Sequence, residues 1–266
     1  MDPGVLLGYV VLGCVVGFLA GLLGIGGGMT LVPILSALFA AQALAPEHTV
    51  HLALGTAMAS IIFTSSASVR AHHKRGAVDW TVARRLAPGM VLGAALATLA
   101  SGFISQRALA LAFAAIVYAG AVQMLFGGRP SVARALPATP AMLAVGIAIG
   151  VICGLVSAGG AFLTVPFMLL CGVPVLAAIG TAAAIGIPVA VVGTVGFVAS
   201  GWRVGGLPEA TLGFVFLPAL AALVVGSVLM APVGARLAHR LPVATLKRIF
   251  ALLLLALATR MVVVYA

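Results

Sequence analysis

One segment of this chain, Gly21–Pro33, returns in recognisable form in the second half as Gly154–Pro166. Six of the thirteen aligned positions are identical, and three glycines and the proline are among them. Duplicated hydrophobic halves that carry a Gly- and Pro-interrupted segment at the same place are typical of secondary transporters. The repeat therefore predicts two related membrane halves, with broken or half-helices at the two Gly-rich motifs.

The composition leaves too few charged residues to cover a water-facing surface. Hydrophobic residues make up 64% of the chain and charged residues 7%, whereas soluble domains carry about 25% charged residues. Apolar runs of roughly 20 residues, the length of a membrane-spanning helix, occur throughout. We therefore expect an all-α, multi-pass integral protein of the cell (inner) membrane, surrounded by the lipid bilayer.

The net charge of +10 does not indicate a nucleic-acid partner. The basic residues stand between apolar runs rather than on a polar face with interleaved aromatics, so they mark one membrane face. The three cysteines lack the spacing of a metal or redox site, and we expect no cofactor. No constellation of nucleophile and base is recognisable, so we expect no enzyme; a homo-oligomer is left open.

The chain divides into ten apolar elements, which we assign to a first repeat over 1–126, a cytoplasmic linker over 127–139 and a second repeat over 140–266. With both termini outside, eleven of the fourteen Lys and Arg residues lie on the cytoplasmic side. Loops that correspond by the repeat carry opposite loads of basic residues, which is typical of two inverted repeats of about five elements each. The expected elements are 5–23, 29–45, 50–69, 84–104, 108–126, 140–157, 162–173, 179–200, 212–235 and 244–265.

A second shared segment follows the first motif, since Gly55–Ala57 matches Gly180–Ala182. Together with the GxGGGx3VP pattern that ends at Pro33, it resembles the sulfite exporter TauE/SafE (TSUP) family over nearly the whole chain. The resemblance implies a multi-helix transporter of sulfur-containing anions such as sulfite and organosulfonates. The second half departs from the pattern with Ser157 and Ala161 in place of glycines, which predicts unequal contributions to the site.

We predict a substrate site at the two motifs. Consecutive glycines at a helix start leave backbone N–H groups and the positive end of the helix dipole open to an anion. The alternative is that the glycines allow close helix packing. Nearby hydroxyls either donate to the same anion or bond within their own helix. The predicted substrate-binding residues are Gly26, Gly27, Gly28, Thr30, Thr56, Ser157, Gly159, Gly160, Ala161, Thr164 and Thr181.

No carboxylate falls in a predicted membrane interior. The four acidic residues, Asp2, Glu47, Asp79 and Glu209, stand in expected loops or at the terminus. Their placement disfavours a cation substrate and proton coupling through a buried acid. We therefore predict a secondary transporter that moves a small sulfur-containing anion, such as sulfite or sulfoacetate, by alternating access. An anion channel on the same scaffold and a non-transport membrane scaffold protein are the alternatives.

The histidines occur near both ends of the third expected element. His48 and His51 are consistent with a pH-sensitive gate or with interfacial packing. His72 and His73 are expected to add to the cytoplasmic basic cluster.

Overall fold

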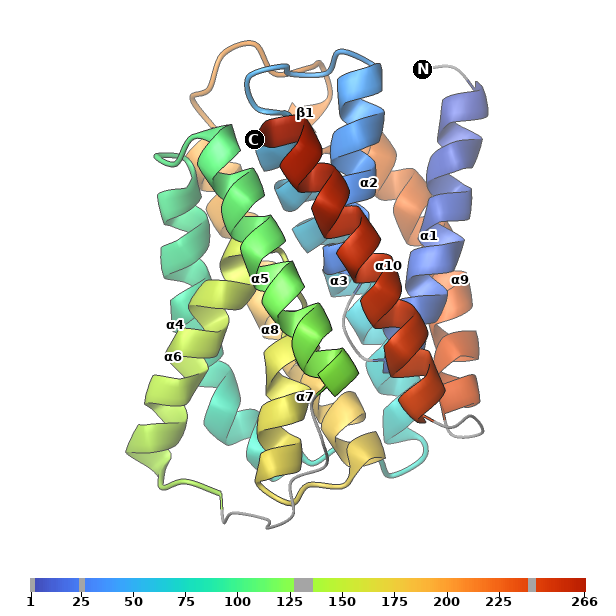
Figure 1. The fold of residues 1–266 in the computed structure, drawn as a ribbon, viewed down its shortest axis with the longest axis vertical. Helices are drawn as coiled ribbons and strands as arrows, with labels where there is room; N and C mark the ends of the chain where they lie inside the picture. Colours follow the sequence, from blue (N-terminus) through green and yellow to red (C-terminus); the bar gives the residue numbers. More distant parts are fainter. Residues whose placement is uncertain (1–2, 24–26, 127–135, 239–242) are drawn as a thin grey trace.

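The computed structural model describes residues 3–23, 27–126, 136–238 and 243–266. These ranges contain ten helices and one short antiparallel hairpin, arranged as a bundle (Figure 1). Six of the helices are long and apolar enough to cross a membrane, which confirms the expected all-α membrane fold. The elements are α1 (Pro3–Leu23), α2 (Gly28–Ala41), α3 (Thr49–His73), α4 (Trp80–Ser101), α5 (Gln106–Phe126), α6 (Thr139–Leu155), α7 (Ala161–Leu170), α8 (Val175–Gly201), β1 (Thr211–Leu212), β2 (Val215–Phe216), α9 (Leu217–Ala238) and α10 (Val243–Tyr265).

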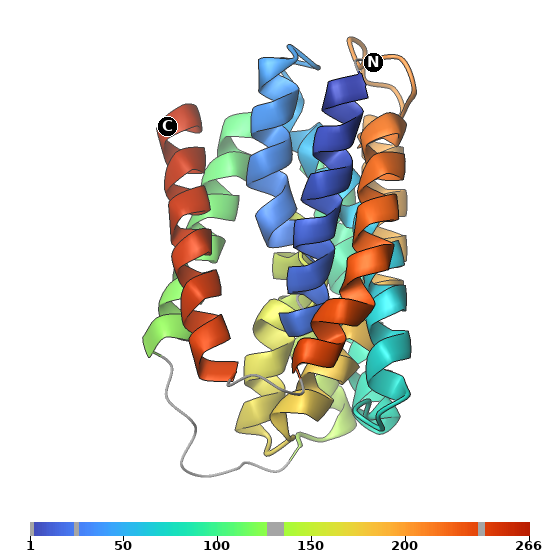
Figure 2. The same cartoon turned by 90° about the vertical axis from the view of Figure 1, so that its right-hand side faces the viewer.

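The two shortest of the described helices both follow a Gly-rich motif. Helix α2 has 14 residues and α7 has 10, so α7 is about 15 Å long, half of a hydrocarbon core. In Figure 2, α2 occupies the upper half of the molecule and α7 the lower half. The expectation of half-helices at the two motifs is confirmed.

Some expected boundaries differ from those of the structure. Helix α4 begins at Trp80, four residues earlier than expected, because the Asp79 carboxylate accepts hydrogen bonds from the N–H groups of Thr81 and Val82 and caps the helix. The ninth element was expected from residue 212, but the β1–β2 hairpin occupies residues 211–216 and α9 begins after it.

The two halves of the chain interlock instead of forming separate lobes. Helix α1 packs against α9, α4 against α6, and α5 against α10, so each of these pairs joins one half to the other. The central pair is α3 and α8, which are the most buried of the candidate membrane spans. Residues from both halves therefore surround the middle of the bundle.

Glycines bring the backbones of two helix pairs into direct contact. On α1 they recur every fourth residue, at Gly13, Gly17 and Gly21, and on α6 at Gly146, Gly150 and Gly154. A Cβ atom on Gly17 would lie 2.4 Å from the Cα atom of Ser227 on α9, and one on Gly150 would lie 2.2 Å from the carbonyl oxygen of Met90 on α4. These glycines serve packing. They also extend the sequence repeat by two glycines before Gly21 and Gly154.

The two ends of the bundle differ in charge. Both chain termini lie at one end, together with the loop between α8 and α9 (Figure 1). The loop between α3 and α4, which contains Lys74 and Arg75, lies at the opposite end. Assignment of the basic end to the cytoplasm stays a prediction.

Candidate functional site

Each half-helix begins at a motif glycine in the left-handed backbone region. Gly27 (φ 81°) is the N-cap of α2, and Gly160 (φ 92°) is the N-cap of α7. A side chain would strain this conformation, which explains why both repeats have glycine there. Gly26 lies outside the described residues.

The first turn of α2 contains two backbone N–H groups that have no acceptor among the described residues. The N–H groups of Thr30 and Leu31 bond to the Gly27 carbonyl at 3.1 and 3.0 Å. Within the described ranges, the N–H groups of Gly28 and Met29 have no acceptor. Together with the helix dipole, these groups make the helix start electropositive.

The structure brings parts of the two motifs into contact between α3 and α8. A Cβ atom on Gly28 would lie 1.7 Å from the Ser157 carbonyl oxygen, so only glycine fits there. The Ser157 hydroxyl donates to the Leu54 carbonyl of α3 at 2.8 Å. On the other side, the Gly159 carbonyl oxygen lies 2.5 Å from the Cβ position of Gly186 on α8. Ala161 follows as the buried first residue of α7.

Three buried hydroxyls with no partner among the described residues lie on α2 and α3. Thr30 is 1% exposed, and its hydroxyl makes no hydrogen bond to any described residue. The same holds for Ser65 and Ser68 on α3, and the Ser65 hydroxyl is 3.1 Å from the Cβ position of Gly186. A buried polar group left unpaired costs about 1–3 kcal/mol, so these hydroxyls are candidates for ligand contact. Ser65 and Ser68 lie outside the two repeated motifs, and no sequence pattern singled them out.

The matched threonines Thr56 and Thr181 each hold a loop of the other half. Thr56 accepts a hydrogen bond from the Phe216 N–H at 2.9 Å, and Thr181 accepts one from the Asp79 N–H at 2.8 Å. The glycine before each threonine lies against a carbonyl of the same loop. Phe216 and Asp79 immediately precede α9 and α4, so the two contacts fix the starts of corresponding helices.

The structure does not bring these two threonines together. Gly180, beside Thr181, has its Cβ position 3.0 Å from the His72 Cβ atom, and His72 follows Thr56 on α3 by about 24 Å. One small anion cannot touch both. Substrate contact by Thr56 or Thr181 therefore stays a prediction, and the loop contacts give each a structural role.

Thr164 lies in the first turn of α7, where its buried hydroxyl is 3.5 Å from the sulfur of Met90 on α4. Met90 also approaches Gly160, because its terminal methyl lies 2.9 Å from the Cβ position of that glycine. The second motif is thus lined partly by α4, which belongs to the first half.

Two histidines connect helices. The Nε2 atom of His51 lies 3.1 Å from the carbonyl oxygens of both Ser101 and Ile104, at the end of α4, and its ring lies 4.9 Å from that of Phe214. This arrangement fits the packing alternative. The expectation for His72 is wrong, because it is buried and its Nε2 atom lies 3.2 Å from the carbonyl of Gly21 at the end of α1.

The described acidic residues stand outside the helices. Glu47, Asp79 and Glu209 lie between helices. In the described ranges, no group of three His, Cys, Asp or Glu side chains is placed to hold a metal.

The apolar helices and the two half-helices that start at buried glycines define a multi-pass membrane transporter architecture. The family model described as Sulfite exporter TauE/SafE matches residues 9–261, and the chain belongs to this family. No solved structure matches the chain.

Curated relatives carry transporter names. A "Probable membrane transporter protein" of Haemophilus influenzae is 34% identical over 95% of this chain and 96% of its own length. The "Probable membrane transporter protein YdhB" of Bacillus subtilis is 25% identical over 87% of this chain and 89% of its own length. The family and these names identify a membrane transporter, a multi-pass protein of the cell membrane.

Proposed function

We propose that this chain carries a small sulfur-containing oxyanion, sulfite or a small organosulfonate, across the cell membrane by alternating access. The anion is held where the start of α2 meets the second motif. One observation carries the proposal: the buried Thr30 hydroxyl has no partner in the described structure and stands in the same turn as the unused N–H groups of Gly28 and Met29. The family name supports the sulfur-containing substrate.

The chemistry of this site suits a compact anion. Backbone N–H groups at a helix start bind sulfate- or phosphate-like oxygens without a charged side chain. A sulfite or sulfonate group has three oxygens that accept several such bonds at once. A substrate ammonium would find no acid to pair with, because the described acidic residues lie between helices. Organosulfonates without an amine are therefore favoured over taurine.

We further propose that the halves 1–126 and 140–266 are inverted repeats and that their exchange of roles opens the site to either side. The helix packing supports this. Helices α1 to α5 correspond in order to α6 to α10, and the packed pair α1–α9 has its counterpart in α6–α4. In the same way, the pair α2–α3 has its counterpart in α7–α8. Figure 1 shows α1 and α6 running in opposite directions along the bundle. Inverted repeats around a midplane site are the usual basis of alternating access.

Burial at the motifs favours a carrier over a channel. Thr30 is 1% exposed and Ser157 is fully buried, so both are closed to solvent, as in the occluded state of a carrier. A membrane scaffold protein would gain nothing from buried donors without partners, which cost stability.

Counterflow into proteoliposomes tests the proposal. Purified protein is reconstituted, and entry of radiolabelled sulfite is measured with unlabelled anion inside. We expect saturable exchange that is stimulated by internal sulfite or sulfoacetate and much less by taurine. Entry that is indifferent to internal anion and never saturates would instead establish a channel. Equal stimulation by taurine would remove the proposed anion site.

A further inference from the structure

A groove between the ends of α3 and α9 gathers four cationic side chains. The cavity has a volume of about 360 Å³, within the range of about 300–1,000 Å³ that is usual for small-molecule sites. No carboxylate lines it, and in the described ranges none of the four cations forms an ion pair. The lining residues are Ala67, Arg70, Ala71, Lys74, Arg75, Val228, Pro232 and Arg236.

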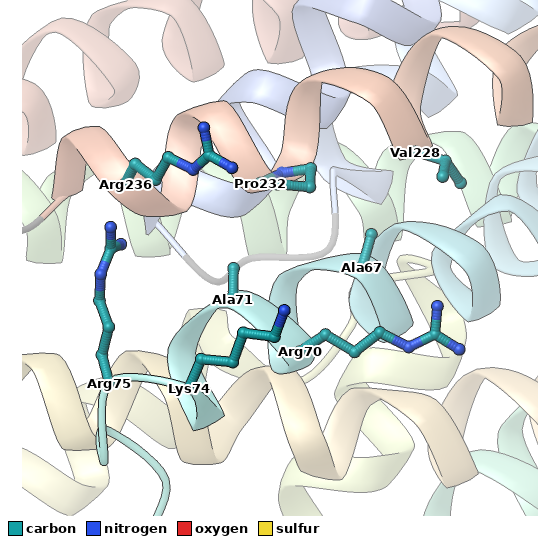
Figure 3. Close-up of a pocket in the computed structure, with 8 residues that line it drawn as sticks. All are labelled: Ala67, Arg70, Ala71, Lys74, Arg75, Val228, Pro232 and Arg236. Atoms are coloured by element: carbon teal, nitrogen blue, oxygen red, sulfur yellow. The ribbon is translucent and has the colours of Figure 1, made fainter.

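The cations stand on both walls of this groove. Figure 3 shows Arg236 on α9 and, across from it, Arg70, Lys74 and Arg75 at the end of α3. Arg75 is held in place, because its Nη1 atom donates to the Ala235 carbonyl at 3.2 Å. A guanidinium retains further donors after one such bond. Like charges collected in one groove repel each other, and a bound anion relieves that repulsion.

The fold does not require a cluster of cations in such a groove. The corresponding groove between α8 and α4, at the other end of the bundle, has a single cation, Arg203, in a lining that is otherwise uncharged and includes Leu99, Val195, Ala199 and Trp202. In the register that aligns Gly55 with Gly180, Val195 corresponds to Arg70 and Ala199 to Lys74. The cluster of four cations is therefore a property of the α3–α9 groove and not of the repeated architecture.

We propose that the α3–α9 groove binds the phosphate of an anionic phospholipid headgroup. Arginine and lysine are the usual partners of phosphate, and basic pockets between membrane helices at the cytoplasmic side bind such headgroups. The apolar surface beside the groove favours a lipid over free phosphate. Val228 lines the cavity, and Val225 and Leu229 on the same helix are exposed, so acyl chains can continue along α9.

Thermal unfolding of the full-length protein in detergent tests this proposal. The probes are dioctanoyl phosphatidylglycerol, dioctanoyl phosphatidylcholine and glycerol phosphate, which carries the phosphate without acyl chains. We expect phosphatidylglycerol to raise the melting temperature at a lower concentration than phosphatidylcholine. The double variant Arg70→Gln/Arg236→Gln should raise the half-saturating concentration on the order of 30-fold, since each basic residue contributes roughly a factor of five.

The matched control is Arg84→Gln/Arg85→Gln, which removes two exposed arginines at the start of α4 that do not line the groove. It should leave the half-saturating concentration unchanged. If both double variants bound phosphatidylglycerol equally weakly, the binding would depend on general surface charge, and the proposed site would be overturned. Equal responses to phosphatidylglycerol and to glycerol phosphate would overturn the lipid assignment. If the double variant does not fold, Lys74→Gln replaces it, and an unchanged response in that variant overturns the site.

Discussion

Thr30 is the residue whose surroundings are least explained by packing. Its hydroxyl is buried and unpartnered in the described structure, while the other buried threonines have partners, as Thr98 has in the Ala94 carbonyl at 2.8 Å and Thr56 in the Phe216 N–H at 2.9 Å. Substituting the cap glycine would be a less direct probe of binding. Gly27 has φ 81°, and a Cβ atom there would lie 2.3 Å from a methyl of Val16. Lost binding and lost folding would be hard to separate.

We therefore predict that Thr30→Val lowers sulfite affinity about 10- to 150-fold, because a hydrogen bond to a charged group contributes about 1.5–3 kcal/mol. The shape of the side chain is kept and no hydrogen bond within the described protein is lost, so the melting temperature without ligand should stay equal or rise. Isothermal titration and thermal unfolding measure the two effects. Thr98→Val is the control, which should lose stability but keep affinity. Unchanged affinity in Thr30→Val would exclude Thr30 from the site.

Among the helices, glycine has two different uses, and position decides which applies. Gly27 and Gly160 start half-helices through their backbone conformation. The glycines at every fourth residue of α1 and α6 instead let neighbouring backbones touch. The packing explanation offered from sequence is thus realised at the glycines of α1 and α6, while the anion site at the motif glycines stays a prediction.

We predict opposite effects for two glycine-to-alanine substitutions in α1. In Gly17→Ala the new methyl would lie 2.4 Å from the Ser227 Cα atom, so α1 and α9 must separate and the melting temperature should fall. In Gly8→Ala the new methyl meets nothing within 4 Å, and the better helix propensity of alanine should add about 0.5–1 kcal/mol of stability. Thermal unfolding in detergent compares them. Equal melting temperatures would contradict the close α1–α9 packing.

For the whole molecule, the unequal charge of the two ends predicts the orientation in the membrane. Basic residues are retained on the cytoplasmic side, so the end that holds Lys74 and Arg75 should face the cytoplasm and the termini should face outward. The bundle places Thr81 near the basic end and Gly205 in the loop at the other end. Both positions are exposed.

Single cysteines at these positions test the orientation in a background from which the three native cysteines have been removed. We expect Gly205→Cys to react with a membrane-impermeant maleimide in intact cells, and Thr81→Cys to react only after permeabilisation. A Cβ atom at Gly205 has open space around it, so the substitution should not disturb the loop. Reaction of Thr81→Cys in intact cells would show that the basic end faces outward, which is opposite to the predicted orientation.

The sequence by itself determined the membrane class of this protein, its ten apolar elements and the short helices that follow the two Gly-rich motifs. Hydropathy sets whether a segment enters the membrane, and glycine and proline set where a helix starts or breaks. Both depend on the local sequence, so they can be predicted without knowing which helices pack together. Gly27 and Gly160 cap helices wherever those helices pack.

Only the tertiary structure decided what depends on contacts between distant segments. It placed Thr56 and Thr181 far apart and buried His72 against Gly21. It also buried the Ser65 and Ser68 hydroxyls of α3 without a partner among the described residues. The four cations of the α3–α9 groove are separated by up to 166 positions in the chain, from Arg70 to Arg236. Their convergence follows from helix packing, because a side chain's partners are set by the neighbouring helix face and not by the local sequence.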